Sequence, residues 1–309
     1  MTSVFLRALS FAFVILLGIM MRASGLVDDD AGNVSKQFMF YLTIPATLIT
    51  NFANVSEITP RLLLLALCGF LANVFMLGLG MFLTRGCSAG VRALYMINLP
   101  SFNVGAFVIP FVQSFLPPLG NVTTCFFDMG NSVVCTGASY SFTAEYLSGG
   151  RGLRGIRVKA LVKRLLTSPP LMASLVMTLL MLLHLQLPGA VLTLIQPLAS
   201  ANPFVAMLTL GLMFRLELKR EYLGQIFKIL LLRISIGTAC ALAFYFLLPF
   251  EAVVRQALVL ISFAPISAVA PAFTGMCGGD QGLASAVNSV TIICSLVITT
   301  FLLGVMGLS

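Results

Sequence analysis

An aspartate and an asparagine lie three residues apart in a segment that is otherwise largely apolar. They are Asp128 and Asn131. Side chains at this spacing lie on one face of a helix. A carboxyl group in such a segment must face water or the inside of a helix bundle, where it can carry a proton or help to hold a cation. The alternative is a structural role, in which Asp128 hydrogen-bonds to a broken helix.

Two other segments each carry a pair of prolines among small polar residues. Their members are Pro100, Ser101, Asn103 and Pro110 in the first, and Pro265, Ser267 and Pro271 in the second. Proline removes a backbone donor and clashes with the preceding turn, so each pair predicts an interrupted helix. Half-helix N-termini at such breaks bind anions through free N–H groups and the positive ends of helix dipoles. A small carboxylate is the ligand that fits; the alternative is that these prolines only kink their helices.

The two halves of the chain repeat these features at similar spacings. Pro110 and Pro271 are 161 residues apart, and Asn131 and Asn288 are 157 residues apart, each asparagine beginning the triplet Asn-Ser-Val. A duplicated unit predicts such similar offsets. We therefore expect Asn288 to join Asn131 and the residues of both proline pairs in one substrate site, with Asp128 as the group that couples transport to a proton or cation.

Motifs of enzymes and metal centres are absent from the sequence. It contains no P-loop, no zinc-ligand spacing and no G-x-S-x-G nucleophile elbow. We therefore expect a protein that is not an enzyme and that needs no cofactor or metal.

The composition excludes most soluble proteins. Of 309 residues, 59% are hydrophobic and 9% are charged, with a formal net charge of +8. Ordinary soluble domains carry about 25% charged residues. The composition therefore excludes soluble enzymes, disordered chains and nucleic-acid binders, and it predicts an all-α, multi-pass protein whose partner is the lipid bilayer.

Ten segments approach the roughly 20 apolar residues that a membrane-spanning helix needs. They are Ser3–Gly25, Gln37–Asn54, Leu62–Thr84, Ala93–Leu116, Val122–Tyr146, Pro170–Leu187, Ala190–Phe214, Leu223–Leu248, Ala252–Met276 and Leu283–Leu308. We read the first as an uncleaved span. Residues 1–146 then form a first five-helix repeat, 147–169 a basic cytoplasmic linker and 170–309 a second five-helix repeat. An odd number of spans per repeat gives the two repeats opposite orientations.

Basic residues predict the orientation of the chain. With both termini outside the cytoplasm, thirteen Lys and Arg residues lie in cytoplasmic loops against three outside, which are Arg7, Arg61 and Arg255. The linker is expected to form an amphipathic helix on the anionic leaflet. Lys228 and Arg233 in the eighth span are expected to extend toward the cytoplasmic face; the alternative for Arg233 is a direct contact with an anion.

Three of these segments resemble motifs of the auxin efflux carrier family, which includes plant PIN carriers and bacterial organic-acid permeases. NLPSFNVGAFVIPF resembles the fourth-span motif, with Asn103 and Pro110 at its characteristic asparagine and crossover proline. FDMGNS, with Asp128 and Asn131, resembles the D-x-G-N pattern of bacterial members. APISAVAPAF resembles the ninth-span crossover, with Pro271 as the second crossing proline.

The resemblance extends over the whole chain, and the short linker is similar to that of the bacterial members. It implies a ten-span inverted-repeat fold in which two crossed broken helices, the fourth and ninth spans, belong to a transport domain. That domain moves against a scaffold domain in an elevator-like cycle. It also implies organic-anion substrates, which are auxin in plants and malate or malonate among bacteria. The third span contains Asn73 and no acidic residue, so proton and sodium coupling both stay open.

We therefore expect a secondary active carrier of small organic anions in the inner membrane of the cell. The sequence leaves open whether it forms a homodimer. The alternative functions are an anion channel and a ligand-sensing membrane protein without transport. Saturable uptake with counterflow distinguishes a carrier from both.

Overall fold

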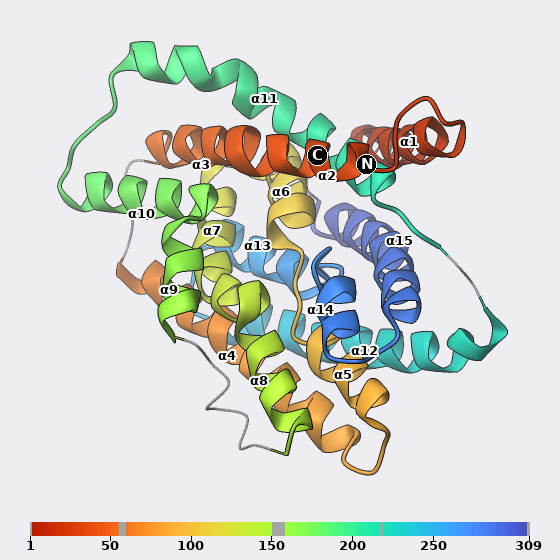
Figure 1. The fold of residues 1–309 in the computed structure, drawn as a ribbon. Helices are drawn as coiled ribbons and strands as arrows, with labels where there is room; N and C mark the ends of the chain where they lie inside the picture. Colours follow the sequence, from red (N-terminus) through yellow and green to blue (C-terminus); the bar gives the residue numbers. More distant parts are fainter. Residues whose placement is uncertain (1, 56–59, 150–157, 217–218, 308–309) are drawn as a thin grey trace.

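The structure is a computed structural model that describes residues 2–55, 60–149, 158–216 and 219–307, and all regular elements in these ranges are helical (Figure 1). The helices before the linker are α1 (Thr2–Ala23), α2 (Ala31–Phe38), α3 (Ile44–Ala53), α4 (Leu64–Leu83), α5 (Ala89–Asn98), α6 (Ile109–Phe115), α7 (Pro118–Val133) and α8 (Ser139–Leu147). The later helices are α9 (Val158–Leu166), α10 (Pro169–Leu182), α11 (Gly189–Leu212), α12 (Leu223–Leu247), α13 (Ala252–Ser262), α14 (Ala270–Met276) and α15 (Gln281–Val305).

Five helical segments in the described part of the chain are long and apolar enough to cross a membrane. They are Leu6–Ala23, Leu64–Leu83, Gly189–Leu212, Arg220–Leu247 and Gln281–Val305. The prediction of an all-helical protein is confirmed for the described residues, and these five segments are candidate membrane spans. The other expected spans consist of shorter helices, so the ten-span inverted repeat stays a prediction.

The surface of these helices is apolar and the interior contains polar side chains. Phe75 on α4, Leu194 on α11 and Phe246 on α12 are exposed, whereas Asn73 and Asn202 on α4 and α11 are fully buried. A soluble protein buries such apolar side chains instead. An outward apolar surface is what a protein in contact with lipid needs.

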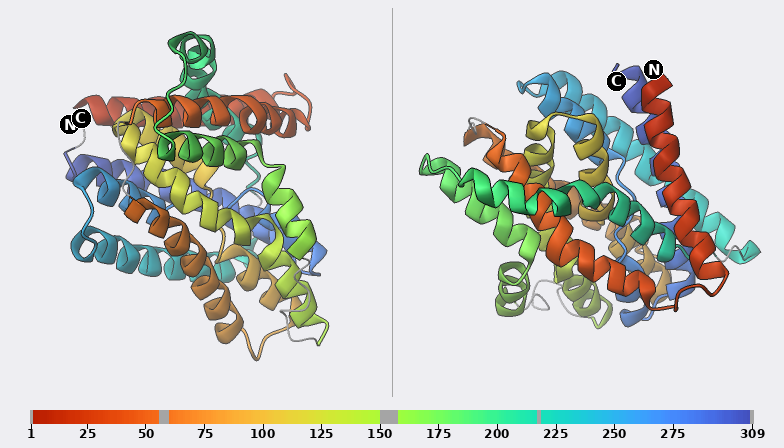
Figure 2. Two further views of the ribbon diagram at one scale, coloured as in Figure 1. Left: turned by 90° about the vertical axis from the view of Figure 1, so that its left-hand side faces the viewer. Right: turned by 90° about the horizontal axis from the view of Figure 1, so that it is seen from above.

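The helices form two groups. The upper group consists of α1, α2, α3, α10 and α11, in which α11 packs against α1, α2 and α3 and crosses above α3 (Figures 1 and 2). The lower group consists of α4 to α8 and α12 to α15, with α4 against α7 and α12 against α13. The two groups meet where α7 contacts α3, α6 contacts α11 and α15 contacts α1.

Glycines bring α4 and α7 close together. A Cβ atom on Gly130 would collide with the carbonyl oxygen of Ala66, and one on Gly69 would collide with that of Phe127. Small residues allow such close packing of membrane helices, where dispersion contacts replace the hydrophobic effect as the source of association. This packing holds the segment that contains Asp128 firmly against α4.

Two expected spans are broken in the middle. In the fourth span, α5 ends at Asn98 and a π-helical turn begins at Val104, so residues 99–103 are outside both helices. In the ninth span, α13 ends at Ser262 and α14 begins at Ala270. Residues 99–103 and 263–269 are called the first and second break below.

The positions of the breaks differ from the expectation. Pro100 and Pro265 lie within the breaks, but Pro110 and Pro271 each lie at the second position of a helix, α6 and α14. A π-helical turn, Val104–Val108, directly precedes α6. Such a turn lets the helix continue past Pro110 although the proline supplies no backbone donor.

The basic linker contains the expected short helix, α9, in which apolar Leu165 is half-buried and basic Lys163 is exposed. Residues 150–157 of the linker lie outside the described residues. The division of the chain into two repeats and a linker stays a prediction.

Candidate functional site

The two breaks contact each other directly. The backbone N–H of Asn103 in the first break donates to the carbonyl oxygen of Pro265 in the second, at 2.8 Å. The N–H of Ser267 donates to the Oγ atom of Ser101 at 3.2 Å. Unwound backbone in hydrocarbon costs several kcal/mol for each unsatisfied group, so non-helical segments survive only where protein or water satisfies them. Each break supplies partners for the other.

Asn131 connects the first break to α4 and to Asp128. Its Nδ2 atom donates to the carbonyl oxygen of Phe102 at 3.1 Å and to Oδ1 of Asp128 at 2.7 Å. Its Oδ1 atom accepts from Nδ2 of Asn73 at 3.1 Å. Ser132, one turn after Asp128, also hydrogen-bonds to this carboxylate. Asp128 therefore reaches the broken helix through Asn131.

Asn73 and Ser132 belong to this cluster although they were not among the expected site residues. Ser132 is four residues after Asp128, and this spacing could have identified it. Asn73 is far from Asn131 in sequence, and only the close approach of α4 and α7 brings the two amides together.

Two of the expected asparagines keep a buried polar atom without a hydrogen-bond partner among the described residues. Oδ1 of Asn103 accepts from the N–H of Ala106 at 3.3 Å, whereas its Nδ2 atom is unpaired. Oδ1 of Asn288 is likewise unpaired. These two residues are 6% and 9% exposed. A buried polar group without a partner costs about 1–3 kcal/mol, so such atoms indicate a place where a ligand or water can bind.

Asn288 is linked to the breaks indirectly. It lies on α15 three residues before Thr291, whose Oγ1 atom accepts from the backbone N–H of Ile266 in the second break at 3.2 Å. Pro110 and Pro271 are buried within their helices and lie outside the hydrogen-bonded junction of the two breaks. The structure thus pairs Asn103 with Pro265, Ser267 with Ser101, and Asn131 with Asp128 by hydrogen bonds. Asn131 reaches the first break through the carbonyl oxygen of Phe102. The other expected site residues, Pro110, Pro271 and Asn288, make no hydrogen bond to these groups among those found in the described residues.

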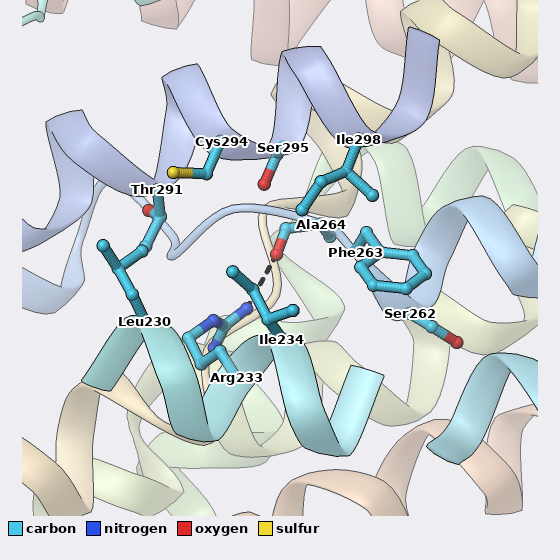
Figure 3. Close-up of a pocket in the computed structure, with 10 residues that line it drawn as sticks. All are labelled: Leu230, Arg233, Ile234, Ser262, Phe263, Ala264, Thr291, Cys294, Ser295 and Ile298. Carbon is cyan, nitrogen blue, oxygen red and sulfur yellow. Dashed lines mark hydrogen bonds between the residues drawn. The ribbon is translucent and has the colours of Figure 1, made fainter. Parts of the chain in front are cut away.

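Arg233 also belongs to this region, so its expected extension toward the cytoplasmic face is wrong. One terminal nitrogen, Nη1, donates to the carbonyl oxygens of Asn98 and Leu99 at 3.2 and 2.7 Å. The other, Nη2, donates to the carbonyl oxygen of Ala264 at 2.7 Å, and Figure 3 shows this bond. The side chain is buried, and its guanidinium lies 5.1 Å from the centre of the Phe102 ring. The sequence indicates only a charge within an apolar helix, not the direction in which it points.

A small pocket lies beside Arg233, between α12, α15 and the second break (Figure 3). Its polar lining includes Ser262, Thr291 and Ser295, and Ile234 and Ile298 form apolar walls. A cavity volume of about 20 Å³ gives room for about one water molecule.

A second polar network joins the upper and lower groups. Gln113 on α6 accepts a hydrogen bond from Nδ2 of Asn202 on α11 at 3.2 Å, and Oδ1 of Asn202 accepts from Thr43 at 2.9 Å. Thr43 and Asn202 are fully buried. Of these three residues, Gln113 belongs to the same interrupted span as the first break.

One comparison with known proteins bears on function. Residues 154–303 match the family model described as a membrane transport protein. No curated protein matches the chain. The matched stretch contains Arg233, the second break and Asn288. Over just under half of its length the chain is therefore similar to a family described as membrane transport proteins.

Proposed function

We propose that this protein is a secondary carrier of small organic anions, with dicarboxylates such as malate or malonate as the substrate class. The observation that carries the proposal is the unpaired, buried Nδ2 atom of Asn103 at the junction of the two breaks. An amide N–H in this position can donate to a carboxylate oxygen. The helical turn that begins at Val104 directs its first N–H groups to the same region.

The electrostatics of the junction also favour an anion. Helix N-termini carry about half a positive charge each, and the turn at Val104 and α14 both begin at a break. Asp128 is the acidic side chain that contacts this junction through Asn131. We assign Asp128 the coupling role, in which it carries a proton or holds a cation while the substrate is bound.

Energy for accumulation would come from an ion or substrate gradient, since the sequence contains no P-loop for a nucleotide. The match to the membrane transport protein family supports transport as such. We further propose the bacterial organic-acid permease type of the auxin efflux carrier family, related to plant PIN carriers, in the inner membrane with both termini outside the cytoplasm.

The arrangement of the two helix groups supports an elevator-type cycle. The lower group contains both breaks and the Asp128 cluster, so these could move as one body against the upper group. Contact between the groups includes the small polar network of Gln113, Asn202 and Thr43. Hydrogen bonds of this kind can exchange partners when one group slides past the other.

Uptake into proteoliposomes tests the proposal. Wild-type protein should take up labelled malonate or malate with saturation and should show counterflow when the vesicles are loaded with unlabelled substrate. Asn103→Ala and Asn131→Ala should abolish this uptake while inserting normally. Asn51→Ala is the matched control, because the hydrogen bond found for Asn51 among the described residues goes to the Thr47 carbonyl within its own helix, α3.

The alternatives predict other results. A channel would conduct without saturation or counterflow, and a sensor would bind a carboxylate without moving it. Uptake by the Asn103→Ala variant at the rate of the wild-type protein would overturn the assignment of the site. Absence of uptake by the wild-type protein with every carboxylate tested would overturn the carrier function.

A further inference from the structure

The side chain of Arg233 lies where the first halves of both broken helices end. The carbonyl oxygens that it binds belong to Asn98 and Leu99, at the C-terminus of α5, and to Ala264, just after the C-terminus of α13. Helix C-termini carry about half a negative charge each. One guanidinium therefore faces two negative helix ends together.

Among the described residues, the charge of Arg233 is compensated by carbonyl groups and not by a carboxylate. Both ion pairs found among the described residues involve Asp29, which lies in the turn before α2. Burying an unpaired cation is costly, but three carbonyl oxygens at 2.7 to 3.2 Å and the Phe102 ring lower that cost. A carboxylate partner would cancel the positive charge of Arg233. With the two helix ends as partners, the same positive charge instead balances their partial negative charges.

Backbone carbonyl oxygens are also the groups that hold alkali cations in membrane proteins. Here the two terminal nitrogens of one guanidinium bind three such oxygens. Arg233 thereby neutralises the negative C-terminal ends of α5 and α13 without a bound ion. The helix N-termini that follow the two breaks keep their partial positive charge.

We propose that Arg233 is the fixed cation of the anion site. It is a positioning residue: it holds the backbone of both breaks and keeps the junction positive enough to bind a carboxylate without sodium. This inference rests on the proposed carrier function. It predicts that wild-type uptake has the same KM in sodium and in choline buffers.

Charge and hydrogen bonding can be separated by substitution. Arg233→Lys keeps the charge and loses the forked geometry, whereas Arg233→Gln keeps hydrogen-bond donors and loses the charge. We expect Arg233→Gln to raise the KM for malonate about tenfold or more, the size expected when one full charge is lost from a site of low dielectric constant. Arg233→Lys should raise the KM less. A role in folding alone would instead lower the yield of folded protein equally in both variants and leave the KM unchanged.

Chemical rescue gives a second, independent measurement. Arg233→Ala removes the side chain and leaves the three carbonyl oxygens, so guanidinium ions at millimolar concentration should restore much of the lost uptake, and sodium should do so in part. Lys228→Gln is the matched control, because Lys228 lies on the same helix with an exposed side chain and its loss should leave the KM unchanged.

The outcomes separate the two proposals. Absence of carboxylate uptake by wild-type protein overturns the carrier function. If the wild-type protein takes up carboxylate, two results would overturn only the role of Arg233. One is an unchanged KM in Arg233→Gln, and the other is no response of Arg233→Ala to guanidinium or sodium. Thermal unfolding in detergent shows which variants are folded, and Arg233→Lys supplies the comparison if the alanine variant does not insert.

Discussion

The side-chain amide of Gln113 replaces a hydrogen bond that a proline removes from another helix. Nε2 of Gln113 on α6 donates to the carbonyl oxygen of Ala199 on α11 at 2.8 Å. The residue four positions after Ala199 is Pro203, which has no N–H to offer that carbonyl. This carbonyl oxygen, which also accepts from Oγ1 of Thr47 at 3.3 Å, is thus bound by a side chain of the lower group, at the boundary that an elevator motion would have to cross.

Replacing Gln113 by Leu should therefore destabilise the protein. The carbonyl of Ala199 would lose this donor and Nδ2 of Asn202 would lose its acceptor, at a cost of about 1–3 kcal/mol. Thermal unfolding in detergent measures the change. Gln196→Leu is the control, since Gln196 is exposed on the same α11 and should tolerate leucine. Equal unfolding temperatures for the two variants would contradict the role of Gln113.

The packing of α4 on α7 makes a second prediction. Gly130→Ala should lower the free energy of unfolding by about 1–3 kcal/mol, because the new Cβ atom collides with the Ala66 carbonyl oxygen, which cannot move without shifting α4. Gly78→Ala on α4 is the matched control. A Cβ atom there meets nothing within 4 Å, so this substitution should be neutral or stabilise the helix by about 0.5–1 kcal/mol. An unaffected Gly130→Ala variant would show that the two helices can separate at little cost.

The sequence predicts the chemistry of the site better than its geometry. Proline and small polar residues indicate two broken helices because proline acts locally, on the turn that precedes it. The exact place of each break depends on what can satisfy the freed backbone groups. Arg233, Asn131 and the partner break provide those groups at residues 99–103. At Pro110 a π-helical turn carries the helix onward instead.

The sequence does not predict the direction in which the side chains of an apolar helix point. Arg233 and Lys228 are five residues apart on one helix, yet one is buried at the junction and the other is exposed. Five residues make one full helical turn and more than a further quarter turn, so the two side chains point in different directions from the helix axis. Only the positions of α5 and α13 decide which one meets the carbonyl groups.

Asp280 gives a prediction about pH. Its carboxylate accepts from the N–H of Leu283 at 2.9 Å and caps the N-terminus of α15. This hydrogen bond, followed by that from the Tyr222 hydroxyl, holds the pKa of Asp280 below its ordinary value. A depressed pKa stabilises the folded protein above the unfolded value of 3.8, and that stabilisation is lost as pH falls toward the folded pKa.

Asp280→Ala should therefore reduce stability at neutral pH by about 0.5–1 kcal/mol, the low part of the range for helix caps because Asp280 is exposed. The difference from wild type should shrink as the pH falls below about 4. Unfolding by denaturant at several pH values measures it. Asp280→Asn keeps a capping oxygen, so it should lose less than the alanine variant; a pH-independent difference for alanine would contradict the role of the carboxylate.

Asp128→Asn separates binding from coupling at the proposed site. The amide has nearly the shape of the carboxyl group and can still accept the hydrogen bond from Asn131, so the first break should keep its support. It cannot take up or release a proton, however, and it binds a cation more weakly. We therefore expect counterflow exchange of malonate to persist while accumulation driven by a pH gradient is lost. Accumulation equal to that of wild type would exclude Asp128 as the coupling group. Asn131→Ala, which removes the contact with Phe102, should abolish both activities, because without it the broken helix loses the amide that holds its backbone.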